Sequence, residues 1–389
     1  MTTTADPIYQ DRTFFAPAFQ IALKGQNIGQ EVIRDVLEVT FTDDLENIDS
    51  FEFALGDWDE VARLPKYSSP WDESGSPRKS ADGRYDLPNF QPGAEVDLKM
   101  GYLGAGDLTP VMKGTVVSIS TSFPAGGAPT CRIRVLNDLH KLQRVTVNGT
   151  YEGTRLGIAE TLLRESGVTT ERPQGLEEED AKTETVNGTL YEEVFRRATE
   201  AGLSIALEEG DAGPVLRMTQ PAQDSAVALL EWGRSLASFT PTLSTRGQVQ
   251  KVVVRSSDIT RTGDGRRVLA EATWADLDVA PEVLGPQSDS ELEDALGDAV
   301  VYIDADETVR TEADARRLAI GRLKEIAREL VTASAATVGA PELRAGQVVE
   351  IAGIGPRFGG LYRITKSTHT LGAAGYTTSF EARKEVLRG

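Results

Sequence analysis

The sequence predicts a mainly β protein with an α+β insertion, and three observations lead to this class. One β module, in the order glycine, strand, turn, glycine, strand, long loop, strand, occurs at Gly93–Val135 and again at Gly346–Ala382. Such an internal repeat indicates two copies of one structural unit in a single chain. Between the copies, the spacing of apolar residues changes from alternating to helical near Thr154. The length of 389 residues is enough for about two to four domains with cores of their own.

The first predicted domain, residues 12–148, begins with β-hairpin signals. Three segments alternate between apolar and polar residues, which is typical of half-buried strands, and turn residues separate them. The first copy of the duplicated module then completes a barrel-like sheet. The three alternating segments are Phe14–Leu23, Val36–Phe41 and Ser50–Leu55.

A long loop, residues 58–92, interrupts this domain before the duplicated module. It contains five prolines together with Ser, Gly, Asp and several aromatic residues. A loop of this length is uncommon in a compact domain and is usually either functional or disordered. Two interpretations stay open: a mobile solvent loop, or an interaction arm that becomes ordered on a partner. The second is suggested by Tyr67, Trp71 and Tyr85, because large aromatic side chains are costly to leave exposed.

Residues 149–220 form a predicted small α+β domain. A helical stripe of apolar residues follows Thr154 and stops at Gly167. A second helix begins at a capping box, in which the hydroxyl of Thr189 is answered by the carboxylate of Glu192 three residues later. Two short alternating runs at 203–207 and 215–218 then predict a hairpin.

The last predicted domain, residues 221–389, carries the second module. Its first two strands, at 236–243 and 249–255, are expected to repeat the first hairpin of the chain. Residues 257–310 read as an acidic, loop-rich insertion with a possible hairpin around residues 262–265, and residues 311–332 as the longest helix. The apolar stripe of that helix is expected to consist of Leu318, Ala319, Leu323, Ile326, Ala327 and Leu330.

Composition excludes several classes of partner. The net charge is −19, from 60 acidic and 41 basic residues, whereas a nucleic-acid-binding surface or an anionic membrane surface favours basic residues. No apolar run approaches the ~20 residues that cross a bilayer, and no apolar signal-peptide core follows Met1. We therefore expect synthesis in the cytoplasm without a signal peptide, no nucleic-acid binding and no direct membrane insertion.

Few residues in the chain suit catalysis or metal binding. The two histidines, His140 and His369, have no metal-ligand spacing to other residues, and the one cysteine, Cys131, lies in an alternating strand. Structural roles are expected for all three, with Cys131 as a small buried hydrophobe. The sequence predicts no catalytic residue, no cofactor and no metal ligand.

The glycine-rich stretch Gly353–Gly360 resembles a nucleotide-binding loop only superficially. A dinucleotide fingerprint needs a helix after the glycines, whereas here the alternating run Leu361–Lys366 predicts a strand. The stretch is therefore interpreted as a hairpin tip with Arg357 and Phe358 exposed.

Several segments resemble the phage late control protein D family. The likeness extends over nearly the whole chain and is weakest at residues 59–90 and 276–300. It is carried by the ordered series Phe14–Phe19, Asn47–Phe53 and Pro92–Tyr102 near the N-terminus, and Gly346–Gly355, Phe358–Thr365, His369 and Gly375–Arg383 near the C-terminus.

Members of that family are baseplate hub proteins of contractile phage tails and contractile injection systems, and they are similar to the hub region of the type VI spike protein VgrG. The resemblance implies a homotrimer in which each chain gives two tube-protein-like β-barrel domains, so that three chains form a pseudo-hexameric ring. It implies a separate spike protein on one side, an inner tube or tube-initiator protein on the other, and further baseplate components around the ring. A negatively charged lumen that repels DNA or acidic cargo is one expectation for the acidic composition.

The expected function is a structural hub that adapts a threefold spike to a sixfold tube, and not an enzyme. The alternative is a tail-associated cell-wall hydrolase with a carboxylate site in residues 150–220. A carbohydrate-binding β protein without threefold assembly is a third hypothesis. Phage tail and injection device are not distinguished. The expected interface residues are Tyr67, Trp71, Tyr85, Arg357 and Phe358.

Overall fold

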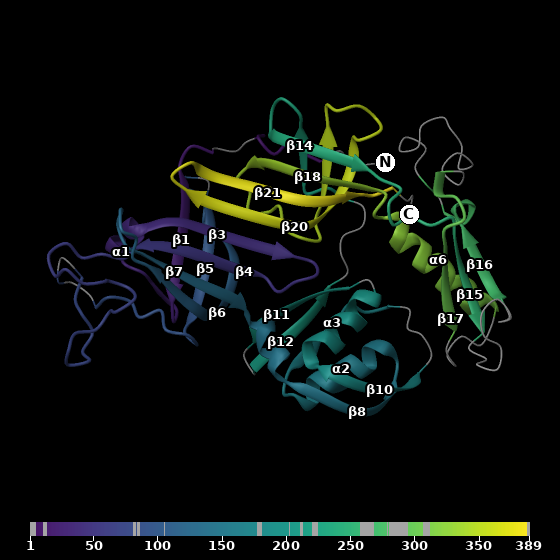
Figure 1. The fold of residues 1–389 in the computed structure, drawn as a ribbon, viewed down its shortest axis with the longest axis horizontal. Helices are drawn as coiled ribbons and strands as arrows, with labels where there is room; N and C mark the ends of the chain where they lie inside the picture. The colour runs from purple at the N-terminus through teal and green to yellow at the C-terminus, as the bar shows by residue number, and fades with distance from the viewer. Residues whose placement is uncertain are drawn as a thin grey trace.

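The protein is mainly β, as predicted, and the longer helices of the described residues lie in two smaller regions. Its strands form one 13-stranded sheet and three small sheets. In Figure 1 the first module lies at the left, the second above it, the α2–α3 region below, and α6 with its sheet at the right. The computed structural model describes residues 5–10, 14–80, 83, 86–104, 106–176, 181–201, 203–210, 213–219, 225–256, 268–277, 279, 295–305 and 312–386.

The first module contains seven strands and a short helix, α1 (Gln30–Asp35). The three predicted N-terminal strands are present, whereas α1 is too short to leave a helical period in the sequence. The strands lie in the order β3-β4-β7-β6-β5-β1, with β2 paired to β1. Their bounds are β1 Pro17–Leu23, β2 Gln26–Asn27, β3 Val36–Asp44, β4 Ser50–Gly56, β5 Glu95–Tyr102, β6 Thr109–Ser122 and β7 Thr130–Asn137.

The second module repeats this order as β14-β18-β21-β20-β19-β13. The copies differ at one end, because β13 runs parallel to β19 whereas β1 runs antiparallel to β5. Its strands are β13 Ala228–Glu231, β14 Leu236–Leu243, β18 Val331–Val338, β19 Val348–Ala352, β20 Gly360–Gly372 and β21 Gly375–Lys384.

Backbone hydrogen bonds show that the two copies share more than strand order. The N–H of Gly93 donates to the carbonyl of Val116, and the N–H of Gly346 donates to the carbonyl of Ile364, both at 2.8 Å. In each copy the N–H of the acceptor residue then bonds back to the residue after the glycine, at 2.9 Å. Both glycines have positive φ, +92° and +86°, a conformation that other residues rarely adopt.

Register shifts also recur at equivalent places. One occurs in the long strands β6 and β20, where they pair with β7 and β21 respectively. The other occurs at the start of β3 in the first module and of β14 in the second. A bulge adds a residue and bends the strand, so matched bulges give the two modules matched curvature. The shifts fall at Val116/Ser118 in β6 and Ile364/Lys366 in β20, and at Val36/Glu38 in β3 and Leu236/Ser238 in β14.

The two modules are joined edge to edge into one sheet. Strand β3 pairs antiparallel with the second half of β20, from Asp44 opposite Lys366 to Glu38 opposite Gly372. The sequence predicts two modules but not this junction, because periodicity identifies strands without identifying their partners. Each module nevertheless has its own apolar core.

A small α+β domain follows β7 and has a third core. The Thr154 hydroxyl caps α2, and Thr189 with Glu192 forms the predicted capping box on α3. The core includes Leu139 and Leu142, which precede the predicted boundary at 149. The elements are η1 Asp138–Arg144, β8 Thr146–Gly153, α2 Arg155–Glu165, β9 Thr169–Glu171, β10 Lys182–Thr189, α3 Leu190–Glu200, β11 Ser204–Gly210 and β12 Gly213–Thr219.

The insertion between β14 and β18 is a second α+β unit. Helix α6 packs on the three-stranded sheet β16-β15-β17, and its residues share a core with the second module. The predicted pairing of residues 249–255 with 236–243 is wrong, because β15 belongs to this separate sheet and β14 pairs with β18. The elements are β15 Lys251–Ser256, β16 Val268–Thr273, η3 Trp274–Asp276, β17 Val300–Ala305 and α6 Glu312–Ala327.

Helix α6 is shorter than predicted. It ends at Ala327 rather than at 332, because β18 begins at Val331. Leu323 and Ala327 lie in the buried stripe as expected, but Leu318 is 39% exposed. The antiparallel pairing of β15 with β16 agrees with the possible hairpin in the insertion, whose tip at 262–265 lies outside the described residues.

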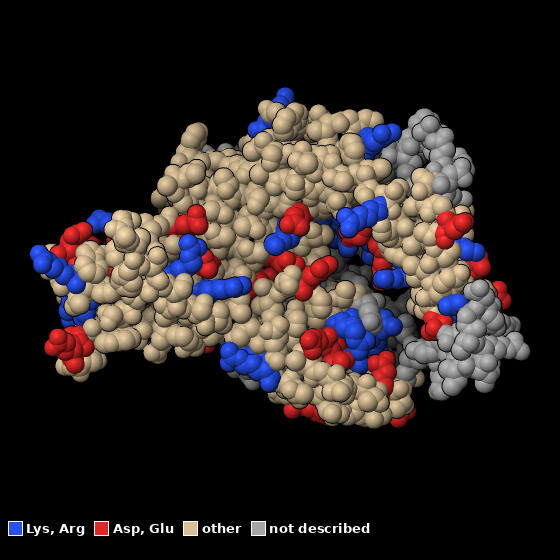
Figure 2. Space-filling model, viewed as in Figure 1, with Lys and Arg blue, Asp and Glu red and all other residues tan. Residues whose placement is uncertain are grey.

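Charge is unevenly distributed on the visible face of the molecule. Figure 2 shows acidic and basic side chains gathered in a band between the second module and the α2–α3 region, whereas the surface over β14 and β18 is largely uncharged. Strand β14, Leu236–Leu243, contains no charged residue.

Candidate assembly surfaces

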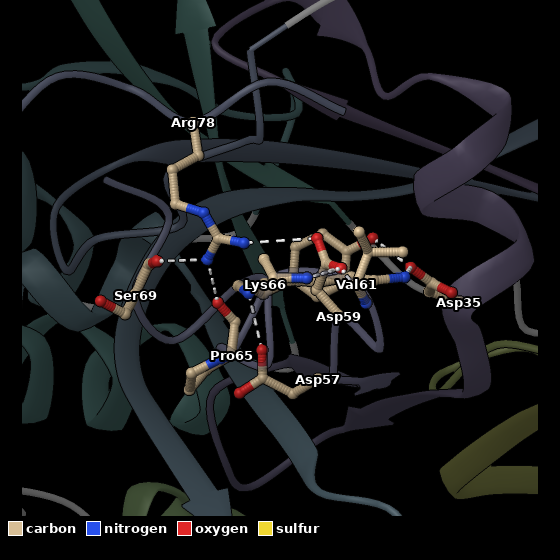
Figure 3. Close-up of polar contacts among 10 residues, drawn as sticks. Asp35, Asp57, Asp59, Val61, Pro65, Lys66, Ser69 and Arg78 are labelled. Atoms are coloured by element: carbon tan, nitrogen blue, oxygen red, sulfur yellow. Dashed lines mark hydrogen bonds and ion pairs between the residues drawn. The ribbon is translucent and has the colours of Figure 1, made fainter. Parts of the chain in front are cut away.

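The arm that follows β4 is anchored to the first module by a buried carboxylate. Asp57 is fully buried, and its Oδ1 accepts hydrogen bonds from the N–H groups of Tyr67 at 2.6 Å and Ser68 at 3.2 Å. The hydroxyl of Ser68 donates to the other carboxylate oxygen. A buried carboxylate needs such partners, so this one fixes the middle of the arm against the end of β4 (Figure 3).

A second carboxylate, Asp35 at the end of α1, holds the same part of the arm. It accepts a hydrogen bond from the Tyr67 hydroxyl at 2.6 Å and pairs with the Lys66 ammonium at 2.8 Å. Tyr67 is 2% exposed, with its ring centroid 6.5 Å from that of Phe90. The expectation that Tyr67 is available to a partner is therefore wrong, because its own module already buries the ring and satisfies the hydroxyl.

Arg78 closes the arm on itself. Its guanidinium donates to the carbonyl oxygens of Pro65 at 2.6 Å and Ser69 at 3.4 Å, and lies 3.4 Å from a carboxylate oxygen of Asp59 (Figure 3). The N–H groups of Ala62 and Val61 bond to the Asp59 carboxylate, and they lower its pKa together with Arg78. The described part of the arm is thus held by contacts within the single chain, whereas the sequence suggested a mobile loop or an arm that becomes ordered on a partner.

The framework of the arm carries exposed apolar side chains. Val61 is 96% exposed, Leu64 48% and Trp71 47%. Trp71 lies on the surface, as an interface residue requires, and Tyr85 lies outside the described residues. No pattern in the sequence indicates the anchors Asp35, Asp57 and Arg78, because only folding brings their partners to them.

The predicted hairpin tip lies between β19 and β20, as expected. Arg357 is exposed, but Phe358 is only partly exposed and packs against the core of the second module. The carbonyl of Phe358 accepts a hydrogen bond from the Tyr362 hydroxyl at 2.7 Å, and that of Arg357 accepts one from the Lys384 ammonium at 2.7 Å. The tip belongs to the second module and the arm to the first, so the predicted interface residues in the described part of the chain come from both modules.

The junction between the modules contains a salt bridge. The Arg344 guanidinium pairs with Asp43 of β3, donates to the carbonyl of Val111 at 3.0 Å, and lies 4.7 Å from the centre of the Phe41 ring. The N–H of Ala345 donates to the same Asp43 carboxylate at 3.1 Å. Because Asp43 is buried, this network fixes the loop before β19 against β3 of the first module.

His369 is fully buried at the same junction. Its Nε2 lies 3.1 Å from the carbonyl oxygen of Leu343, an acceptor, so this nitrogen carries the proton. The other nitrogen accepts from the hydroxyls of Tyr376 at 3.1 Å and Thr378 at 3.0 Å. Burial, assisted by Arg344, lowers the pKa of His369 to about 4. With both nitrogens engaged, His369 is a structural residue, as predicted.

The other residues examined for chemistry are also structural. Cys131 is fully buried, and burial raises the pKa of its thiol to about 12, which keeps it protonated and unreactive. His140 is buried, and its Nδ1 lies 2.9 Å from the carbonyl oxygen of Asn137. Over the described residues, no cluster of His, Cys, Asp or Glu is placed to hold a metal ion. In the same part of the chain, no helix has the length and apolarity that crossing a membrane requires.

Several described carboxylates of the α2–α3 domain are engaged in structural contacts. Arg197, fully buried, pairs with Glu184 at 2.8 Å and with Glu193. Burial alone would raise the pKa of Glu193, but hydrogen bonds from Arg197 and Arg196 outweigh it and lower the pKa. Glu192 serves the capping box. A general acid for glycoside hydrolysis needs a raised pKa, so these contacts give the hydrolase hypothesis no support.

The polar face of the large sheet carries mixed charge. A shallow hollow of about 410 Å³ lies over β14, β18 and β21, lined by residues that include Thr240, Ser334 and Arg383. Acidic and basic side chains face each other across neighbouring strands, which does not favour an acidic surface here. Cross-strand neighbours on this face include Glu52 with Arg134, Asp44 with Lys366, and Lys366 with Glu381.

Solved structures with a similar fold are tail proteins. The 43 kDa tail protein of prophage MuSo2 from Shewanella oneidensis aligns over 96% of this chain and 100% of its own, with a TM-score of 0.65 and 14% identity. The tail protein from Neisseria meningitidis MC58 aligns over 95% and 97%, with a TM-score of 0.61 and 14% identity. These likenesses show that the chain has the fold of phage tail proteins.

A component of the E. coli type VI secretion system, described as structurally similar to the T4 bacteriophage tail proteins gp27 and gp5, aligns over 93% of this chain and 76% of its own, with a TM-score of 0.50 and 12% identity. A family model, the Alg8 N-terminal domain, matches residues 80–372. That model bears a different name from the late control protein D family. No curated protein matches the chain.

Proposed function

The chain belongs to the Alg8 N-terminal domain family, and we propose that it is the structural hub of a contractile tail baseplate or contractile injection system. In this role it adapts a threefold spike to a sixfold inner tube. The protein acts by geometry and not by catalysis. It is made in the cytoplasm and assembled into the baseplate of the particle.

One observation carries this proposal: a single chain holds two modules with the same strand order, side by side in one sheet. Three such chains supply six like modules to a sixfold tube, while keeping threefold symmetry for the spike. The tail-protein fold of the neighbours from Shewanella oneidensis and Neisseria meningitidis supports the same role. So does the fold of the E. coli type VI secretion component.

The partners we propose are two other copies of the chain, a separate spike protein, an inner tube or tube-initiator protein, and further baseplate components. The two modules are not identical, because only the first carries the arm. The exposed Val61, Leu64 and Trp71 on that arm therefore occur three times in the ring, at a spacing suited to a threefold partner. The mixed charges of the sheet's polar face do not favour an acidic lumen.

The test is reconstitution with the spike and tube proteins encoded beside this chain. Native mass spectrometry should give a trimer of about 126 kDa from chains of 42.0 kDa, and electron microscopy should show a ring with the spike on one side and the tube on the other. A chain that stays monomeric in the presence of both proteins would overturn the proposal. Cell-wall cleavage by the purified chain would favour the hydrolase instead.

A further inference from the structure

The junction inside the chain shows how one module can attach to another. Strand β19 covers the first part of one edge of β20, and β3 continues along the same edge from Lys366 to Gly372. The N–H of Leu45 extends the pairing, donating to the carbonyl of Thr365 at 3.0 Å. The attachment therefore consists of backbone hydrogen bonds between the far half of β20 in the second module and β3 in the first.

In the described part of the chain, the corresponding edges of β6 in the first module and β14 in the second have no strand beside them. The bulges in β6 and β20 match, so the far half of β6, Val117–Ser122, is equivalent to the far half of β20. The bulges in β14 and β3 match in the same way, so these two strands are equivalent. Within the described residues, β5 covers β6 only as far as Thr115. Apart from a single bridge between Leu236 and Trp232, β14 pairs only with β18. The described part of each chain thus has these two free edges, one on the far half of β6 and one on β14. They are equivalent to the edges of β20 and β3 that pair inside the chain.

Both edges lack the charged side chains that protect many free strand edges from pairing. Soluble proteins usually place charged side chains on such edges. Neither the far half of β6 nor β14 contains a charged residue, although the chain carries a net charge of −19. Apolar side chains are exposed beside them: Phe123, just after β6, is 58% exposed, and Leu243 of β14 is 39% exposed. The surface over β14 is largely uncharged in Figure 2.

We propose that the far half of β6 in one copy pairs antiparallel with β14 of the next copy, so that one sheet continues around the ring. The internal junction sets the register. Thr368 lies opposite Thr42, and the bulges make Ser120 equivalent to Thr368 and Thr242 equivalent to Thr42. Ser120 of one copy therefore lies opposite Thr242 of the next. This inference rests on the proposed trimeric ring and names the surfaces that form it.

The backbone of β14 is compatible with this arrangement. The N–H of Ser244 donates to the carbonyl of Leu330, on the β18 side. Backbone groups point to alternate sides along a strand, so Leu243 and Pro241 direct theirs to the free edge. Pro241 has no N–H to donate, and proline is one of the residues that disfavour pairing at a strand edge. The proposed pairing loses one hydrogen bond there, while Ile119 and Leu243 come to lie opposite each other.

The β3–β20 junction inside the chain and the proposed β6–β14 junction between copies differ in charge. Gln91 is equivalent to Arg344, because the N–H three residues later bonds to its carbonyl in both cases, at 3.0 and 3.1 Å. Leu243 is equivalent to Asp43. The junction between copies thus has glutamine and leucine where the internal junction has a salt bridge. A separate chain therefore exposes no unpaired charge at this position before it assembles.

Paired cysteines test the register. Ser120→Cys with Thr242→Cys should give disulfide-linked dimers and trimers under mild oxidation, because directly opposed strand residues fall within disulfide reach. Thr42→Cys with Thr368→Cys is the matched positive control and should link within one chain, without a change in mass. Ser120→Cys with Ser238→Cys places the thiols four residues out of register, roughly 13 Å apart, and should stay unlinked. The native Cys131 is buried and does not interfere.

Charge pairs give a second measurement that does not depend on oxidation. Ser120→Lys with Thr242→Lys opposes like charges at every junction and should raise the trimer dissociation constant at least tenfold. Ser120→Lys with Thr242→Glu should restore it to within about threefold of the parent, which a general folding defect would not allow. Native mass spectrometry of each variant supplies the readout.

The outcomes separate this inference from the proposed function. A trimer of about 126 kDa that forms no Ser120–Thr242 crosslink, or links equally at Ser120–Ser238, overturns the edge pairing and leaves the ring standing. The absence of charge rescue in a trimer overturns it as well. A chain that remains monomeric with its spike and tube proteins overturns both.

Discussion

The rings of Phe41 and His369 stack across the junction between β3 and β20, with their centroids 5.6 Å apart and their planes at 27°. One ring comes from each module. The contact therefore buries a titratable group where the two halves of the chain meet, and we expect the attachment of the modules to depend on pH.

We expect acidification to weaken the protein through His369. Its pKa is lowered from 6.5 to about 4 by burial, so the unfolded chain binds a proton more readily than the folded one between these values. Stability from this residue is complete above pH 6.5 and falls as the pH drops toward 4, by about 3 kcal/mol in total. Urea unfolding at a series of pH values measures it.

The comparison variant is His369→Gln, which keeps a hydrogen-bonding side chain but does not titrate. Its stability at pH 7 should be lower, but its loss between pH 6.5 and 4 should be smaller by about the same 3 kcal/mol. Asp49, whose pKa is raised by burial and by nearby Asp43, acts in the opposite direction and is common to both proteins. Parallel pH curves for parent and variant would contradict the assignment.

Removal of Arg344 should weaken the junction more than removal of a surface arginine. Arg344→Met leaves the Asp43 carboxylate buried without its partner, which we expect to cost about 3 kcal/mol. Arg132→Met removes an exposed arginine that pairs with Glu52 on the same sheet, and should cost less than about 1 kcal/mol. Chemical denaturation of both variants measures the difference, and equal losses would show that the junction pair adds nothing.

The arm should open when its internal clamp is removed. Arg78→Met deletes the bonds to Pro65 and Ser69 and the pairing with Asp59. A local loss of about 2 kcal/mol corresponds to about 30-fold more opening, seen as faster proteolysis near the exposed Val61. Lys79→Met, which removes a neighbouring ion pair on the surface, should leave the cleavage rate unchanged. Unaltered proteolysis of the Arg78 variant would show that the clamp does not order the arm.

The stripe of α6 can be tested with two leucines on the same helix. Leu323 is fully buried, so Leu323→Asp places a carboxylate in the core and should lower stability by more than about 4 kcal/mol, enough to unfold the chain. Leu318→Asp, at an exposed position, should cost less than about 1 kcal/mol. Circular dichroism melting curves distinguish the two. Similar melting temperatures would mean that the face of the helix is misassigned.

Local features were predictable because they depend on neighbours in the sequence. The capping box of Thr189 and Glu192, the strand after Gly360 and the burial of Leu323 all follow from patterns within a few residues. The errors occurred where a distant partner decides. Tyr67 is predicted at an interface, but it is buried. It donates hydrogen bonds to Asp35 and Asp57, which lie 32 and 10 residues away in the sequence.

Dependence on distant partners also explains why the pairing of β15 is predicted wrongly. The apolar residues of β15 indicate a strand, as those of the first hairpin do, but its partners are β16 and β17, farther along the chain. Such a pattern shows that a segment is a strand and does not select the strand beside it. The extent of α6 was likewise overestimated, because the apolar residue Val331 suits the end of a helix and the start of β18 equally well.

The mainly β class, the repeated module and the helices between its two copies follow from the sequence, because they depend on short-range periodicity, glycine positions and capping residues. Folding brings β3 against β20 and holds the arm through Asp57 and Arg78. It also leaves the outer edge of β14 and one edge of the far half of β6 without a neighbouring strand in the described part of the chain. Such pairings depend on which backbone edges meet after folding, and the backbone is the same in every strand.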